Sequence, residues 1–418
     1  MIYFYRVIWL ILSPIVDIWF ISRLFSKKED KSRLKERLGI SSIIRPRGKL
    51  IWFHGSSVGE TLSILPLINK LLEQDEKLNI LVTSGTITSA KLMAEKLPPR
   101  AFHQYIPLDF YTIVSTFMEH WKPDLSIFVE SEFWPELLHQ APNKVLINAR
   151  ISDRSFKRYG KHKWFIQTLL KGFKLCLAQS TQDEQRLKDL GIKNVKMSGN
   201  LKFDVETPKI DAKKIKELSA INDKTILVAS STHDPEETWL AAVHLKLKEK
   251  IPNLLTIIVP RHPARGNKLT EQLAEFGNIK QRSKNEQPKE DTDFYIADTI
   301  GEMTLWYTLA KNNGVVFMGK SLIPHGGQNP LEALKLNVPV ICGPYMTNFK
   351  DMMDNLLKDK AIHQVEDIEA LTQGLEEILT NKTKRNKLIK PIGCAMEKLA
   401  GATDYTADKI INLLGGFK

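Results

Sequence analysis

A carboxylate that could contact a ligand stands early in the chain, at the junction of a predicted strand and a predicted helix. In the stretch KLIWFHGSSVGE, Leu50–Phe53 suit a buried strand, Gly55–Gly59 a tight loop, and Thr61–Leu72 a helix. Glu60 then lies outside the carboxyl end of a strand, where ligands collect in an open α/β sheet. A plainer role is also open, because an acid in a first helical turn stabilises its own helix by roughly a few tenths of a kcal/mol.

A second candidate site needs an anionic ligand. Arg261 and His262 follow an apolar run and are bounded by Pro260 and Pro263, which stiffen the turn. A guanidinium group suits bidentate contact with phosphate. By itself the motif is short, so it predicts an anion site only together with other loops.

The run HGGQNPLE, residues 325–332, has further anion-binding features. Its two glycines permit close approach of the backbone, Asn329 can cap a helix, and Pro330 fits the first helical position. Free N–H groups there would meet a phosphate, and Glu332 could accept hydrogen bonds from ribose hydroxyls. A plain glycine turn before a capped helix remains the alternative. The turn Asp298–Glu302 leads into a helix in a similar way.

Several other kinds of site are disfavoured. Asp291 and Asp293 form a D-x-D pattern, but within a charged loop that is expected to be solvated, so we expect no metal. Neither G-x-G-x-x-G nor a P-loop follows the first strand, and we expect no cofactor. The three cysteines are far apart and form no CxxC pair, which disfavours a zinc site or disulfides and indicates a reducing, cytoplasmic compartment.

These candidate residues fall at the ends of elements that alternate between strand and helix. The predicted strands are 50–53, 79–83, 102–106, 125–129, 144–148, 175–178, 195–197, 226–229, 255–259, 293–297, 314–317 and 338–342. The predicted helices between them include 86–96, 111–120, 181–190, 235–249, 266–276, 301–310, 330–335 and 349–358. Such alternation is typical of parallel, doubly wound sheets with right-handed crossovers.

Length and composition divide the chain into two domains. A chain of 418 residues with 43% hydrophobic content exceeds one ordinary core. A polar, Lys-rich stretch with weak periodicity, 205–224, is predicted to link a domain over 49–204 to one over 225–418. Two such domains facing across a cleft suit an enzyme that binds a nucleotide in one half and an acceptor in the other.

The N-terminus is predicted to attach the protein to a membrane. Residues 1–22 are apolar and aromatic, interrupted by Arg6, Pro14 and Asp17, and a basic juxtamembrane segment follows over 23–48. That order keeps the body of the protein on the cytoplasmic side. The formal charge of +12 favours an anionic partner such as a phospholipid surface or a phosphorylated substrate.

Read together, the motifs resemble those of the 3-deoxy-D-manno-octulosonic acid (Kdo) transferases of lipopolysaccharide assembly. The resemblance covers nearly the whole chain and rests on SVGE (57–60), ESEFWP (130–135), NAR (148–150), GNLKFD (199–204), STH (231–233), PRHP (260–263) and NPLE (329–332). Two departures are that Gln328 stands where the family often has His, and Thr86–Ser89 where it has T-P-T-G. The resemblance implies the GT-B architecture, with two Rossmann-like domains.

The resemblance also implies a reaction and a set of site residues. The reaction is inverting transfer of Kdo from CMP-Kdo to the lipid A precursor, at the inner membrane with its anionic lipids and on the cytoplasmic side. Glu60 matches the base, and Glu130 and Lys202 match residues that stabilise the transition state. The CMP contacts matched are Pro260, Arg261, Ile300, Gly301, Glu302, Asn329, Pro330, Leu331 and Glu332.

Two other classes of protein are considered. A nucleotide-sugar 2-epimerase would share the architecture but does not need a hydrophobic N-terminus. A nucleic-acid-binding protein would use the basic charge, yet the chain has no aromatic-interleaved basic strand, so we expect no nucleic acid partner.

Overall fold

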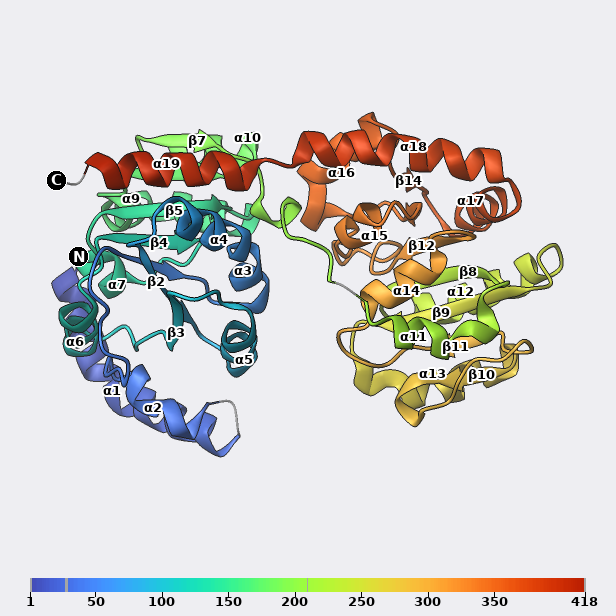
Figure 1. The fold of residues 1–418 in the computed structure, drawn as a ribbon, viewed down its shortest axis with the longest axis horizontal. Coiled ribbons are helices and arrows are strands. Elements are labelled where there is room, and N and C mark those ends of the chain that lie inside the picture. Colours follow the sequence, from blue (N-terminus) through green and yellow to red (C-terminus); the bar gives the residue numbers. More distant parts are fainter. Residues whose placement is uncertain (1, 27–28, 209, 417–418) are drawn as a thin grey trace. The chain divides into compact units, whose positions relative to one another are not determined.

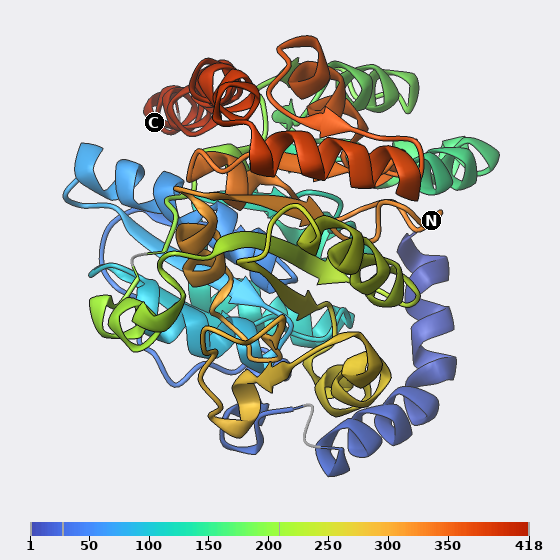
Figure 2. The same ribbon diagram turned by 90° about the vertical axis from the view of Figure 1, so that its right-hand side faces the viewer.

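The protein folds into two units, each built on its own parallel sheet. The structure is a computed structural model and describes residues 2–26, 29–208 and 210–416. The first unit comprises Met1–Val205 and Leu399–Lys418, and the second comprises Glu206–Lys398 (Figures 1 and 2). Lys27 and Lys28 of the predicted basic segment lie outside the described residues.

The first unit has a seven-stranded sheet in the order β3-β2-β1-β4-β5-β6-β7, with all neighbouring strands parallel. This order places β1 and β4 side by side at the point where the winding reverses, which is where ligands bind in doubly wound sheets. The strands are β1 Leu50–His54, β2 Asn79–Ser84, β3 Ala101–Tyr105, β4 Leu125–Val129, β5 Lys144–Ala149, β6 Leu175–Ala178 and β7 Val195–Met197.

Helices cover both faces of this sheet because successive strand residues point to opposite sides. Leu50 and Trp52 of β1 pack into one apolar cluster, and Ile51 and Phe53 pack into another. The helices are α1 Ile2–Phe25, α2 Leu34–Arg37, α3 Val58–Ser63, α4 Leu65–Gln74, α5 Ile87–Lys96, α6 Tyr111–Trp121, α7 Pro135–Gln140, α8 Asp153–Lys161, α9 Lys163–Leu170, α10 Thr181–Asp189 and α19 Ala402–Gly416, with 3-10 turns η1 Lys31–Arg33 and η2 Leu201–Phe203.

The second unit repeats the scheme with seven strands in the order β10-β11-β9-β8-β12-β13-β14. The strands are β8 Thr225–Thr232, β9 Leu254–Pro260, β10 Ile279–Gln281, β11 Phe294–Ile296, β12 Gly314–Met318, β13 Val340–Cys342 and β14 His363–Gln364. Its helices are α11 Ala212–Glu217, α12 Glu236–Lys248, α13 Gly266–Leu273, α14 Met303–Ala310, α15 Leu331–Lys335, α16 Lys350–Lys358, α17 Ile368–Thr380 and α18 Lys382–Leu399, with 3-10 turns η3 Ser219–Ile221, η4 Pro263–Arg265, η5 Ala274–Phe276, η6 Arg282–Lys284 and η7 Thr347–Phe349.

The predicted α/β class with two parallel sheets is confirmed, and each predicted strand is present to within three residues at its ends. The predicted helix Thr61–Leu72 is wrong in its bounds. Helix α3 begins earlier, at Val58, and ends at Ser63. Helix α4 begins at Leu65, after Ile64, with Pro66 in its first turn. Glu60 therefore lies inside the first turn of a short helix rather than just before a long one.

The ends of the two units differ from the domain ranges that the sequence predicts. Part of the stretch 205–224 is helical in α11 and η3, where Leu218 and Ile221 are fully buried in the second unit. The last helix, α19, belongs to the first unit, because its apolar residues Ala407 and Ile410 join the same cluster as β1.

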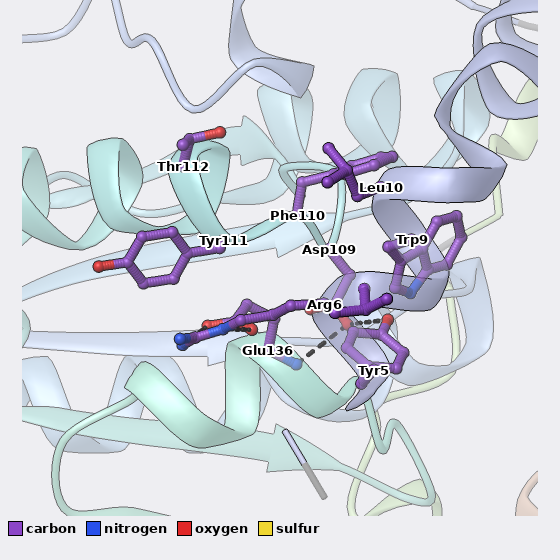
Figure 3. A pocket seen from close by; sticks show the side chains of 10 residues that line it. Tyr5, Arg6, Trp9, Leu10, Asp109, Phe110, Tyr111, Thr112 and Glu136 are labelled. Atoms are coloured by element: carbon purple, nitrogen blue, oxygen red, sulfur yellow. Dashed lines mark hydrogen bonds and ion pairs between the residues drawn. The ribbon is translucent and has the colours of Figure 1, made fainter. Parts of the chain in front are cut away.

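Helix α1 lies along the outside of the first unit in both views (Figures 1 and 2). Arg6 makes two hydrogen bonds to the buried Glu136 carboxylate, at 2.8 and 3.0 Å, and the Tyr5 hydroxyl donates to Asp109 at 2.6 Å. The Trp9 ring packs on Phe110 with centroids 5.0 Å apart. Figure 3 shows these side chains around an apolar pocket of about 320 Å³ between α1 and the start of α6.

The opposite side of α1 is apolar and exposed. Its most exposed large side chains are Tyr3, Phe4, Ile11, Ile15, Ile18 and Phe25, and Leu10 is as exposed although it borders the pocket. Among the residues that the structure describes, no helix combines the length and the apolar character that crossing a membrane requires.

Candidate active site

The carboxyl edge of the first sheet carries Glu60 in the first turn of α3, after the short loop that follows β1. The Ser57 hydroxyl accepts a hydrogen bond from the Glu60 N–H at 3.3 Å and so caps α3. The Glu60 carboxylate in turn accepts from the Ser57 hydroxyl and from the Ser56 N–H, both at 2.7 Å. This arrangement is close to a capping box, except that the carboxylate accepts from the N–H of the residue before the N-cap, so the plainer helix-start role of Glu60 is present in the structure.

The same contacts fix the carboxylate for proton transfer. Glu60 is 9% exposed, so its charged form has little contact with water. Burial raises the pKa of the Glu60 carboxyl above its usual value, the Ser57 hydrogen bond opposes this, and the charges of Glu130 and Glu132 add to it. A carboxylate with a raised pKa is a stronger base, so capping the helix and accepting a proton are compatible roles.

Glu130 follows directly after β4 with a φ of 59°, a backbone conformation that is uncommon for a residue with a side chain. Its carboxylate pairs with the Lys202 ammonium at 2.6 Å. Strained residues of this kind cluster at functional sites because the surrounding structure must hold them in place. The structure thus joins Glu130 and Lys202, which are 72 positions apart.

A network of amides holds the loop that presents Lys202. Asn148, at the end of β5 and also at positive φ, accepts from the Leu201 N–H at 3.0 Å. Asn200 caps η2 by accepting from the Lys202 N–H, and it donates to Gln179 at 3.0 Å. Leu201 is fully buried. The Lys202 stem therefore starts from a fixed backbone.

Two residues at this edge were not singled out from the sequence. His54, the last residue of β1, is buried, and its Nε2 atom lies 3.6 Å from Oε2 of Glu132. Glu132 also accepts from the Trp134 indole N–H at 2.8 Å. The sequence signal that could have indicated them is the pair of carboxylates Glu130 and Glu132 directly after β4, together with the imidazole of His54 at the end of the neighbouring strand β1.

In the second unit, Pro260 and Arg261 end β9 at the carboxyl edge of the sheet. Pro260 is buried, and the Arg261 N–H donates to the Thr232 carbonyl at 3.0 Å. The Arg261 side chain is exposed. Its guanidinium is therefore accessible to a ligand at the edge where the sequence predicts the anion site.

Glu302 is engaged within the protein. Its carboxylate receives two hydrogen bonds from Arg282 at 3.0 Å, one from Lys214 at 2.7 Å and one from Thr299 at 2.6 Å. The Arg282 contact is the main cause that lowers the pKa of the Glu302 carboxyl to about 2. In the same turn Gly301 adopts a φ of 84°, and Ile300 is 88% exposed, so a ligand here would meet the Ile300–Gly301 backbone.

The loop 325–332 differs by one residue from the predicted helix start. Helix α15 begins at Leu331, which is buried, and Pro330 is its N-cap rather than its first residue. Asn329 accepts from the Leu331 N–H at 3.1 Å, as a capping residue would. Glu332 is half-buried and accepts from the Thr304 hydroxyl.

Three imidazoles connect these second-unit loops. The His233 ring lies 6.2 Å from the His262 ring and 5.9 Å from the His325 ring, measured between centroids. The loops after β8, β9 and β12 therefore meet at one place. Among the described residues, no group of three or more His, Cys, Asp or Glu side chains is arranged to hold a metal ion.

The solvated loop predicted around the D-x-D pattern is present only in part, because Asp291 is exposed but the next two residues are not. Thr292 is fully buried, and Asp293 is 9% exposed. The Asp293 carboxylate accepts from the Asn278 N–H at 2.9 Å and pairs with Lys248. Its side chain is thus part of the structure of the second unit.

Comparison with known proteins gives close sequence relatives. A family model described as 3-deoxy-D-manno-octulosonic-acid transferase (kdotransferase) matches residues 32–205. The 3-deoxy-D-manno-octulosonic acid transferase of Rickettsia bellii is 35% identical over 380 residues, which cover 90% of each chain. That of Haemophilus influenzae is also 35% identical, over 400 residues and 92% of each chain.

Solved structures share the fold at low sequence identity. A UDP-GlcNAc 2-epimerase from Neisseria meningitidis aligns with a TM-score of 0.60 at 13% identity, covering 87% of this chain and all of the epimerase. A glycosyltransferase from Rickettsia africae aligns with a TM-score of 0.59 at 14% identity, covering 89% of this chain and 99% of that one. At such identity the likeness shows the fold alone.

Proposed function

The chain belongs to the 3-deoxy-D-manno-octulosonic acid (Kdo) transferase family, and we propose that it transfers Kdo from CMP-Kdo to the lipid A precursor, releasing CMP. It is a glycosyltransferase of lipopolysaccharide biosynthesis. The nucleotide-sugar 2-epimerase alternative has only the shared fold in its favour, at 13% identity. The 35% identity over 90% of the chain lies with transferases.

The observation that carries the mechanism is the buried Glu60 carboxylate at the carboxyl edge of the first sheet. Two donors, the Ser56 N–H and the Ser57 hydroxyl, fix its orientation, and burial raises its pKa. A general base must be held in place and must bind a proton tightly enough to remove it from a hydroxyl group. Glu60 meets both requirements.

The transfer is an inverting displacement at the anomeric carbon of Kdo. The acceptor hydroxyl gives its proton to Glu60, its oxygen bonds to the anomeric carbon, and the bond from that carbon to the CMP phosphate oxygen breaks. The leaving electron pair stays on the CMP phosphate. Lys202, held against Glu130 at 2.6 Å, supplies a positive charge at the edge where the hydroxyl reacts.

The donor half of the reaction is assigned to the second unit. Arg261 is exposed at the end of β9 and suits a charge-assisted contact with the CMP phosphate. The glycines at 326 and 327, with φ of 87° and 73°, let the neighbouring backbone approach a ligand closely. Glu302 is assigned to holding this part of the unit together, because its carboxylate is already bound by Arg282 and Lys214.

We further propose that α1 lies in the inner-membrane interface on the cytoplasmic side. Its inward side is held to the first unit by Arg6 and Tyr5, and its outward side is apolar and exposed. Such a two-sided helix suits the boundary between acyl chains and headgroups. Lys31 and Lys35 are exposed and suit anionic lipids, whereas Arg33 and Arg37 pair with Glu36 and Glu29.

Product analysis tests the reaction. Purified protein is incubated with CMP-Kdo and the lipid A precursor. The mass of the lipid product is determined by mass spectrometry, and the amount of free CMP is measured. We expect a mass increase by Kdo residues and CMP release that depends on the acceptor. Acceptor-independent CMP release, or an unmodified lipid, would reject the proposal.

Vesicle flotation tests the position of α1. Replacing Phe4, Leu10 and Ile11 together by Ser should reduce binding to vesicles that contain anionic lipid, because three exposed apolar groups are lost. Ile44, which is 88% exposed outside α1, gives the control Ile44→Ser. Equal flotation of the triple variant and the control would contradict this role. Substitution is preferable to deletion of 1–22, because deletion would leave the buried Glu136 without Arg6.

A further inference from the structure

His54 has a buried nitrogen without a hydrogen-bond partner, next to the proposed base. The residue is 1% exposed, and its Nε2 atom is buried with no hydrogen bond. Buried polar atoms are nearly always paired, so an exception at a candidate active site needs an explanation. The nearest charged atom is Oε2 of Glu132, 3.6 Å away.

The surroundings of the other ring nitrogen fix where its proton lies. Nδ1 faces the Thr83 carbonyl at 3.2 Å and the Thr83 hydroxyl at 3.1 Å. That hydroxyl gives its only proton to the Phe53 carbonyl and accepts from the Trp52 indole N–H. The Thr83 carbonyl can only accept a hydrogen bond, so Nδ1 carries a proton. In neutral His54, the Nε2 lone pair would face a carboxylate oxygen.

A second proton removes this repulsion. We propose that His54 and Glu132 share a proton as a buried imidazolium–carboxylate pair, and that this pair is a positioning unit that sets the charge around the base Glu60. The Nε2–H group of His54 then points at Oε2 of Glu132, and both ring nitrogens have acceptors. This inference rests on the proposed function, since the pair is proposed to act on Glu60, the base of that reaction.

Ser56 connects the pair to the base. Its backbone N–H donates to Glu60 at 2.7 Å, and its side chain is hydrogen-bonded to Glu132. Burial tends to raise the pKa of the Glu132 carboxyl, but the nearby His54, with Trp134 and Ser56, outweighs burial and lowers the pKa. Glu132 thus stays ionised beside Glu60.

The charged groups at this edge make the effect of each partner predictable. Glu60 faces Glu130 and Glu132, Glu130 is paired with Lys202, and Glu132 is paired with His54. Removing the negative charge of Glu132 lowers the proton affinity of Glu60. Removing the positive charge of His54 leaves the Glu132 charge uncompensated and raises the proton affinity of Glu60. Substitutions of the two partners must therefore shift the pKa of Glu60 in opposite directions.

The test is the pH dependence of Kdo transfer by the full chain. A base must be ionised, so the acid limb of kcat/KM follows the pKa of Glu60. We expect Glu132→Gln to move this limb to lower pH and His54→Asn to move it to higher pH, each by about 0.5 to 1 pH unit. The double variant should return close to the wild-type limb. A purely structural role would lower rates without moving the limb, and unmoved limbs or equal shifts would overturn the proposal.

A spectroscopic measurement keeps the proposal testable without turnover. In protein with ¹⁵N-labelled histidine, the NMR signal that disappears in His54→Asn belongs to His54. We expect imidazolium shifts for it at pH 7 in wild type. A neutral His54 ring in the wild type would refute the pair even if Kdo is transferred. Absent transfer with an imidazolium present would instead refute the proposed function. Glu132 is partly exposed, so its variant remains informative if His54→Asn fails to fold.

Discussion

Acidic residues serve opposite purposes at the carboxyl edges of the two sheets. At the first edge three carboxylates, Glu60, Glu130 and Glu132, gather around one lysine and one histidine. At the second edge Glu302 is bound by Arg282 and Lys214. The pKa shifts follow, because burial and like charges raise that of Glu60 whereas Arg282 lowers that of Glu302 to about 2.

A second acid extends the contrast. Glu236 is fully buried and accepts from the backbone N–H groups of His233, Lys320, Ser321 and Leu322, at 2.6 to 3.2 Å. Its carboxylate thus ties together the loops after β8 and β12. Burial raises the pKa of the Glu236 carboxyl, as it does that of Glu60, but the carboxylate of Glu236 is engaged by four backbone donors that hold two loops together. The first edge therefore suits proton transfer, and the second suits a fixed cradle for an anion.

The strongest test of this contrast is Glu60→Gln. The amide keeps the shape and most hydrogen bonds but cannot accept a proton, so transfer should fall by about 10²- to 10⁴-fold. Melting temperature and CMP affinity, measured on the same variant, should change little. Glu73→Gln, at an exposed site on α4, is the control. Near wild-type turnover of Glu60→Gln would show that Glu60 is not the general base, and Glu130 would be the next carboxylate to test.

The next largest effect is expected from Lys202→Met. It leaves Glu130 without its cation and removes positive charge from the reacting edge, so transfer should fall by about 10²- to 10³-fold. Steady-state kinetics with both substrates measure this. Lys188→Met, which breaks an exposed pair with Glu184 on α10, should have little effect. Equal losses in the two variants would show that the Lys202 charge has no special place.

The donor edge is tested by Arg261→Ala. If the guanidinium contacts the CMP phosphate, CMP binding should weaken by roughly 1.5–3 kcal/mol, about 10- to 150-fold. Calorimetry with CMP measures this. Lys268→Ala, at an exposed position on α13, is the matched control. Wild-type CMP affinity in Arg261→Ala would give the 260–263 turn another purpose.

The smallest effect is expected from Glu302→Gln, and it concerns stability. Because the pKa of Glu302 is depressed to about 2, its ion pairs contribute stability that is fully present above about pH 4.5 and is lost as pH falls toward 2. The variant should lose about 2 kcal/mol of unfolding free energy at pH 7 and little near pH 2. Urea unfolding at both pH values measures this. A loss that is independent of pH would contradict the ion-pair explanation.

Part of this site could be read from local sequence. The apolar runs before His54 and Glu130 fix strands, and the S-x-x-E pattern at Ser57–Glu60 fixes a helix start, because both depend on neighbouring residues. Parallel strands bring their carboxyl ends to one edge, so two carboxylates that each follow a predicted strand, Glu60 and Glu130, share that edge. The positions of the predicted CMP residues at the edge of the second sheet follow for the same reason.

Other features depended on contacts between distant residues. Arg6 interrupts an apolar segment in the sequence, yet in the fold it pairs with Glu136, 130 positions away. Lys214 falls in a stretch that resembles a linker, yet it binds Glu302. The local sequence likewise does not indicate that α19 packs on the first unit, because its apolar positions would suit the core of either unit.

By itself, the sequence determined the alternation of strands and helices, the two parallel sheets and the motifs of the Kdo transferase family, because these follow from spacing and residue type. Only the tertiary structure decided which charges meet. It placed His54 against Glu132, Lys202 against Glu130 and Arg282 against Glu302. Proton affinity depends on burial and on charges within a few ångströms, and neither quantity is encoded by the distance between residues along the chain.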